Sequence, residues 1–91
     1  MTTQKEVKAI QAHSDSVSSI LALNSSPYFV TGGCEGVVKL WDIRKYLCVG
    51  EVQAHRKKYS EGVCSLAAHT RMPFIATSGA DSTTKIYTIS V

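Results

Sequence analysis

Short runs of aromatic and β-branched residues alternate with clusters of glycine, proline, serine and asparagine along the 91-residue chain. Runs of this kind predict β-strands separated by turns, and no stretch shows the 3.6-residue periodicity of a helix. The expected strands are 6–11, 17–23, 28–31, 37–42, 47–53, 63–68, 74–78 and 84–90. Residues 17–23 are apolar on both faces, which predicts a deeply buried strand. The pattern therefore predicts an all-β fold.

The segment from residue 17 to residue 42 is repeated in the second half of the chain. With Val17 placed over Val63, the two segments align without a gap up to Asp42 over Thr88. Upstream, the Ala-His pair at 12–13 recurs at 54–55, and the second copy carries four more residues between this pair and its first strand. A repeat of about 40–45 residues with His near its start and Trp-Asp at its end is typical of WD-repeat β-propellers.

The repeat predicts three parts of a propeller fragment. Residues 6–11 form the outer strand of a preceding blade, residues 12–53 a first WD repeat, and residues 54–91 a second repeat whose blade lacks its fourth strand. The expected architecture is about two four-stranded antiparallel blades. Because two blades leave apolar faces and sheet edges open, we interpret the chain as the tail of a longer propeller or a truncated form of one. Its first partners would be the remaining blades; self-association of several copies into a ring is the alternative.

Composition and charge narrow the class of protein. The hydrophobic content of 44% favours a packed core over disorder. No apolar run approaches the roughly 18–20 residues of a spanning helix, so no transmembrane segment is predicted. The three cysteines are odd in number and lack paired spacing, which favours free thiols and a cytoplasmic location, including as part of a complex at a membrane. The net charge of +3 comes from one basic cluster at residues 56–58.

Three segments of the second repeat are distinctive: AHRKKY at 54–59, FIATSGAD at 74–81 and KIY at 85–87. Together they resemble the carboxy-terminal repeat of the striatin family, while the first repeat matches through motifs generic to WD repeats. The resemblance implies a non-catalytic scaffold of the kind that organises protein phosphatase two A and kinase signalling complexes, whose components would be the partners. The coiled-coil, caveolin-binding and calmodulin-binding segments of that family lie upstream of the propeller.

WD repeats of this type typically hold a buried series of an indole, a hydroxyl, an imidazole and a carboxylate. Carried over by position, the series is Trp41, Thr31, His13 and Glu35 in the first repeat and Tyr87, Thr77, His55 and Asp81 in the second. Glu35 is one methylene longer than the usual Asp, and Tyr87 replaces the indole. A Thr-His-carboxylate set also occurs in hydrolases. Catalysis, however, needs an exposed nucleophile beside an oxyanion hole. A hydroxyl inside a strand of each repeat therefore predicts a structural role, and no enzyme activity is expected.

Histidines and cysteines are numerous enough to raise the question of a metal site. The candidates are His13, His55, His69, Cys34, Cys48 and Cys64. Two of the histidines are assigned to the repeat, and the cysteines are spread over separate parts of the chain without the paired spacing of a zinc site. We therefore predict packed thiols, a surface His69, and neither a metal nor another cofactor.

The loop between the two repeats is the best candidate for partner binding. It carries Arg56, Lys57, Lys58 and Tyr59, and in a propeller it would lie on the top face near the central channel. Such a basic and aromatic surface suits an acidic or phosphorylated protein, although a solvated charged loop is equally compatible with the sequence. The alternative function is binding of nucleic acid or acidic lipid through Arg56-Lys57-Lys58. Nucleic acid is disfavoured because one cluster lacks the extended basic stripe of such proteins.

Overall fold

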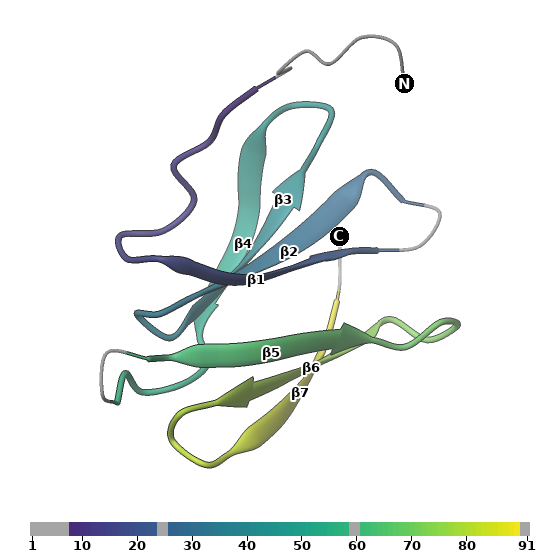
Figure 1. Cartoon of the computed structure of the whole chain (residues 1–91). Coiled ribbons are helices and arrows are strands. Elements are labelled where there is room, and N and C mark those ends of the chain that lie inside the picture. Colours follow the sequence, from purple (N-terminus) through teal and green to yellow (C-terminus); the bar gives the residue numbers. More distant parts are fainter. Residues whose placement is uncertain (1–7, 24–25, 59–60, 90–91) are drawn as a thin grey trace, which may run out of the picture.

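A computed structural model describes residues 8–23, 26–58 and 61–89, and these residues form two antiparallel sheets (Figure 1). The first sheet has the order β1 (Val17–Ala22), β2 (Tyr28–Gly33), β3 (Val37–Asp42) and β4 (Leu47–Gln53). The second has the order β5 (Val63–Ala68), β6 (Phe74–Gly79) and β7 (Thr84–Thr88). Within each sheet, every strand pairs with its neighbour in sequence, as short hairpin connections require. The prediction of an all-β fold is confirmed.

The expected strands 28–31 and 74–78 extend further than predicted, because β2 and β6 include the glycines that follow, while β7 stops at Thr88. The expected strand at 6–11 lies only partly within the described residues. Residues 8–11 form no strand, and residues 6 and 7 lie outside the described residues. Since an outer strand of a preceding blade would pair with that blade, its assignment stays a prediction.

The two sheets share one pairing register. Val17 lies opposite Gly33 and Val63 opposite Gly79, and in both sheets the register then shifts by one residue, before Ser19 and before Ser65. A shift of this kind is a β-bulge, which bends and twists the strand that carries it. The ungapped sequence repeat thus corresponds to a repeat of strand register, bulge included.

The sheets pack face to face (Figure 1). Apolar side chains fill the space between them. The buried cluster comprises Val30, Val38, Ala54, Val63 and Ile75. Partly buried side chains extend it: Leu23, Leu40, Leu66, Ala68, Tyr87 and Ile89. The core therefore lies between the two repeats and not within either one, as expected where each repeat is a single sheet.

The expected deep burial of strand 17–23 is wrong for this chain. Ile20 on β1 is 68% exposed, whereas Leu66, its equivalent on β5, is partly buried against the core. The reason is position: Leu66 faces the first sheet, while no described residue forms a sheet over the side of β1 that carries Ile20. An apolar strand is buried only where another layer covers it.

Candidate interaction surface

A chain of hydrogen bonds joins four side chains of the first sheet. Thr31 Oγ1 accepts from the Trp41 indole N–H at 2.9 Å and lies 2.7 Å from His13 Nε2. His13 Nδ1 lies 3.0 Å from Glu35 Oε2. One tautomer satisfies all three contacts: Nδ1–H donates to Glu35, Nε2 accepts from the Thr31 hydroxyl, and Thr31 accepts from Trp41. The loop before β1 is thereby attached to β2, to the β2–β3 turn and to β3.

The second sheet builds a related series from equivalent positions. His55 Nε2 lies 2.8 Å from Thr77 Oγ1, and His55 Nδ1 lies 2.9 Å from Asp81 Oδ1. His55 and Thr77 are both at most 2% exposed. Both carboxylates also accept backbone N–H groups, that of Ser14 in the first sheet and that of Arg56 in the second. The acid and the imidazole thus fix the loop that enters each sheet.

The two series differ at the position of the indole. Tyr87 packs against the core, and within the described part of the chain it makes no hydrogen bond to Thr77. Thr83, which the repeat pattern did not indicate, joins the second series. Its hydroxyl donates to Asp81 at 2.7 Å and lies 3.2 Å from His55 Nδ1. A signal was available, since a hydroxyl two residues after an Asp commonly bonds to its carboxylate.

The carboxylates of the two series are held ionised by their hydrogen bonds. Burial opposes ionisation of Glu35, but hydrogen bonds from its own backbone N–H and from His13 outweigh this and lower the pKa of the carboxyl. The Thr83 hydroxyl, followed by His55 and two backbone N–H groups, holds the pKa of Asp81 well below its usual range. Donors aimed at a carboxylate favour its charged form, so both groups are anionic at neutral pH.

The turn at Gly36 joins the first sheet to the start of the second repeat through the backbone. Its carbonyl accepts from the N–H groups of Ala54, at 3.0 Å, and His55, at 3.1 Å. Gly36 has φ 93°, and a Cβ there would lie 1.8 Å from the His55 carbonyl oxygen. Glycine is therefore required twice over, by conformation and by the close approach of the next repeat.

The basic loop lies on this same end of the molecule. Arg56, Lys57 and Lys58 are exposed, and Tyr59 lies outside the described residues. The loop is less open than predicted, because Lys57 Nζ lies 2.7 Å from Asp15 Oδ2 of the first repeat. The Asp15 carboxylate raises the pKa of Lys57, and Lys57 lowers that of Asp15. One of the three cations therefore bridges the two repeats.

The sequence carried a signal for this ion pair. Asp15 follows His13 by two residues and Lys57 follows His55 by two, so opposite charges occupy equivalent positions of successive repeats. Beyond Lys57, the described residues Lys58 and Glu61 exchange two backbone hydrogen bonds. These bonds hold the two residues beside each other.

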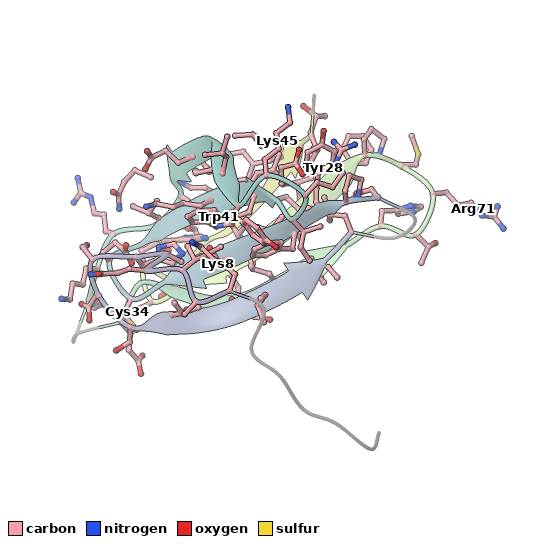
Figure 2. All side chains as sticks on the ribbon, turned by 90° about the horizontal axis from the view of Figure 1, so that it is seen from above. Lys8, Tyr28, Cys34, Trp41, Lys45 and Arg71 are labelled. Atoms are coloured by element: carbon pink, nitrogen blue, oxygen red, sulfur yellow. The ribbon has the colours of Figure 1, made fainter. Side chains whose placement is uncertain are left out.

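The remaining candidates are dispersed. Cys34 is half-buried, Cys48 and Cys64 are exposed, and His69 accepts two backbone N–H groups of its own loop. Figure 2 shows Cys34 and Arg71 at opposite ends of the molecule. Over residues 8–23, 26–58 and 61–89 no three His, Cys, Asp or Glu side chains gather in a group suited to a metal ion. Nor does that part of the chain contain a helix long and apolar enough to cross a membrane.

Comparison with known families identifies the class of protein. The WD domain, G-beta repeat family matches residues 4–42 and 46–88, so the chain belongs to the WD-repeat family. The chain superposes on the crystal structure of the computationally designed Ika8 protein with a TM-score of 0.74 and 20% sequence identity. The superposition covers 93% of this chain and 24% of that one. At that identity the likeness concerns the fold alone.

The chain is also similar to proteins of the striatin family. It is 33% identical to Striatin-3, 32% to Striatin-4 and 31% to Striatin of Homo sapiens, each over 85 residues and 93% of this chain. The match covers 11% of each of these relatives, so the chain spans about a tenth of their length. The resemblance to striatin predicted from residues 54–87 is confirmed.

Proposed function

We propose that this chain is a non-catalytic scaffold for protein–protein interaction, corresponding to the carboxy-terminal repeats of a striatin-like protein. The observation that carries the proposal is the similarity to Striatin-3 over 93% of the chain. The hydrogen-bond series support it: Thr31 and Thr77 are buried in the middle of sheets, with His13 and His55 buried in the entry loops beside them, where a nucleophile would be out of reach of substrate. We assign them a structural role, to hold the loops that enter each sheet.

The proposed binding surface is the end of the molecule formed by these loops, with Arg56 and Lys58 as its exposed cations. Loops held on a rigid sheet are favoured sites of recognition, and paired cations suit an acidic or phosphorylated segment. The partners we propose are components of phosphatase two A and kinase signalling complexes, in keeping with the striatin-like sequence. The free state of the described cysteines fits a cytoplasmic location.

Capture of named components tests the proposal. Tagged chain, the double variant Arg56→Glu/Lys58→Glu and the control Lys45→Glu/Arg71→Glu are each incubated with purified phosphatase two A and kinase subunits. Both pairs of cations are exposed, but Arg71 lies at the opposite end of the molecule (Figure 2). We expect the loop variant to lose at least about tenfold in affinity, as charge reversal at a binding surface does, and the control to bind as the original chain does.

Equal binding by the loop variant would contradict this surface, and no binding by the original chain would contradict the partners. Competition with polynucleotide and with phosphatidylserine vesicles covers the alternative of an anionic ligand. If either binds with a steep dependence on salt and displaces the proteins, the basic loop serves that ligand instead.

A further inference from the structure

The loops that join β1 to β2 and β5 to β6 lie on one side of the molecule, away from the basic loop (Figure 1). Between them is a hollow of about 310 Å³ that both repeats line. Its half-buried part is apolar, with Leu23 from the first repeat and Phe74 and Ile89 from the second. Its exposed rim carries polar side chains, among them Ser26 from the first repeat and Arg71 from the second. We call this the inter-loop hollow.

Ser26 is followed by Pro27, and these two residues form the one Ser-Pro or Thr-Pro sequence of the 91-residue chain. A serine or threonine directly before a proline is what proline-directed protein kinases recognise. The equivalent residues of the second repeat are Met72 and Pro73, so both repeats have the proline and only the first has a hydroxyl before it. Because two residues are a weak motif, their structural context decides what they mean.

The position of Ser26 suits a phosphorylation site. Ser26 is exposed and lies in the connection between β1 and β2, outside both strands. Its Oγ accepts the backbone N–H of Tyr28 at 3.1 Å, and since the oxygen acts as an acceptor there, its own proton remains available. The Pro27 carbonyl accepts the N–H of Ile43 at 2.8 Å, which holds the loop beyond the serine. The hydroxyl is thus accessible on an anchored loop.

His69 brings a hydrogen-bond donor to the rim of the inter-loop hollow. Its Nδ1 accepts the backbone N–H groups of Arg71, at 3.1 Å, and Met72, at 3.0 Å. A ring nitrogen that accepts carries no proton, so the imidazole proton is on Nε2. His69 is exposed and lines the hollow. Its Nε2–H group is therefore a donor suited to an anion at the rim.

Arg71 brings a cation to the same rim. It is exposed and forms no ion pair with another described residue. Its side chain extends from the end of the molecule (Figure 2), and a guanidinium binds phosphate oxygens in pairs. Arg44, which lies 6.0 Å from the centre of the Tyr28 ring, is already paired with the Asp42 carboxylate at 3.1 Å. Arg71 is therefore the better receiver for a phosphate at Ser26.

We propose that Ser26 is a phosphorylation site of a proline-directed kinase and that its phosphate binds Arg71 and His69 of the second repeat. In the reaction Ser26 Oγ attacks the γ-phosphorus of Mg·ATP on the kinase. The bond from that phosphorus to the bridging oxygen breaks, ADP leaves, and the hydroxyl proton passes to the catalytic base of the kinase. A neutral hydroxyl is thereby replaced by a group of charge about −1.5 to −2.

The apolar part of the inter-loop hollow keeps this phosphate at the rim. An anion is not transferred into contact with Leu23 and Phe74, because it would lose its hydration without gaining a partner. The rim offers Arg71, His69 and water instead, and the Tyr28 N–H that Ser26 Oγ now accepts can donate to a phosphate oxygen. The phosphate would therefore link a loop of the first repeat to a loop of the second.

Phosphorylation of the folded 91-residue chain tests the site. The purified chain is incubated with Mg·ATP and either a cyclin-dependent or a mitogen-activated protein kinase, which are two classes of proline-directed kinase. We expect one phosphoryl group per chain, located on Ser26 by mass spectrometry. Ser26→Ala should lose it, and so should Pro27→Ala, which keeps the hydroxyl. The control Pro73→Ala, at the equivalent proline, should be phosphorylated as the original chain is.

No phosphate on Ser26 with either class of kinase would overturn the site. Equal phosphorylation of Pro27→Ala would do so too, because the proline would then not direct the reaction.

Titration of the phosphate by ³¹P nuclear magnetic resonance tests the receiving groups. The second ionisation of phosphoserine lies near pH 6, and neighbouring cations and donors favour the dianion. We therefore expect the phosphate on Ser26 to titrate about 0.2–0.7 of a pH unit lower in the folded original chain than in Arg71→Met/His69→Gln. The control Arg56→Met removes an exposed arginine from the basic loop and should titrate as the original chain does. Equal titration of the original chain and the double variant would contradict the receiving groups.

The melting temperature tests the link between the repeats. Phosphorylation should raise it by about 1–5 °C, as expected for an exposed ion pair in a domain of this size. Arg71→Met should remove most of the gain, whereas Arg56→Met should keep it. A melting temperature that falls on phosphorylation, or a gain that survives in Arg71→Met, would contradict the link.

Discussion

The first and second sheets have the same register and the same bulge, yet they differ in what surrounds them. The turn of the first sheet must be glycine, because Gly36 meets the His55 carbonyl of the next repeat. The equivalent turn residue of the second sheet is Ser82, at φ 67°, and no described residue follows it as a further repeat. Position within the array, and not the hairpin itself, decides which residues the turn tolerates.

The largest effect is expected from Gly36→Ala, which disrupts the contact of the Gly36 turn with the second repeat. We expect a loss of about 3 kcal/mol or more in the free energy of unfolding, since φ 93° and the approach of the His55 carbonyl both exclude a side chain. Urea denaturation measures the loss. Gly50→Ala is the control, because a Cβ there meets nothing within 4 Å; equal losses for both variants would contradict the junction.

The two hydrogen-bond series should respond unequally to loss of their hydroxyl. Thr31→Val leaves the Trp41 indole N–H and His13 Nε2 without a partner, and we expect a cost of about 2–3 kcal/mol. Thr77→Val leaves only His55 Nε2 without a partner, with an expected cost of about 1–2 kcal/mol. Thr84→Val on the exposed face of β7 should change little. A larger loss at Thr77 than at Thr31 would argue against this difference.

Acid should destabilise both sheets through their carboxylates. The folded-state pKa values of Glu35 and Asp81 are lowered, while unfolded carboxyls titrate near pH 4 (about 3.9 for Asp and 4.3 for Glu). The stabilisation is therefore present above about pH 4.3 and is lost progressively as the pH falls below it.

The corresponding measurement is the melting temperature between pH 7 and pH 3. We expect it to fall on acidification, and Asp81→Asn and Glu35→Gln to melt lower than the original chain at pH 7. The gap should narrow toward pH 3. A gap that stays constant with pH would show that ionisation of these groups does not matter.

The smallest expected effect is a gain. Ser82→Gly relieves a left-handed residue and makes the second turn like the first, which should stabilise the chain by about 0.5–1 kcal/mol. Ser82→Ala, which keeps the Cβ, is the matched control. A loss of stability with glycine would mean that the Ser82 side chain has a role of its own.

Much of the fold could be predicted because repetition specifies it. One hairpin such as 28–42 is a weak signal. Its recurrence at a constant spacing predicts the strand order, and the strand boundaries to within a few residues. Burial could not be predicted in the same way. Ile20 and Leu66 are both apolar and hold equivalent positions, and whether each is covered depends on a neighbouring sheet that the local sequence does not describe.

The residues of the candidate site could be predicted better than the hydrogen bonds that they make. His13, Thr31, Trp41 and Glu35 lie together as their positions in the repeat suggest. Tyr87 does not reach Thr77, since a phenol on that strand packs into the core, and Thr83 bonds to Asp81 instead. Contacts between repeats, such as Lys57 with Asp15, depend on how two sheets are placed and are the hardest to read from sequence.

The three thiols differ in exposure and should therefore differ in their rates of alkylation. Cys48 on β4 and Cys64 on β5 are exposed, while Cys34 is half-buried, in the turn whose backbone lies against Gly62 of the second repeat. Alkylation requires an accessible thiolate. We therefore expect Cys34 to be labelled more slowly than Cys48 and Cys64.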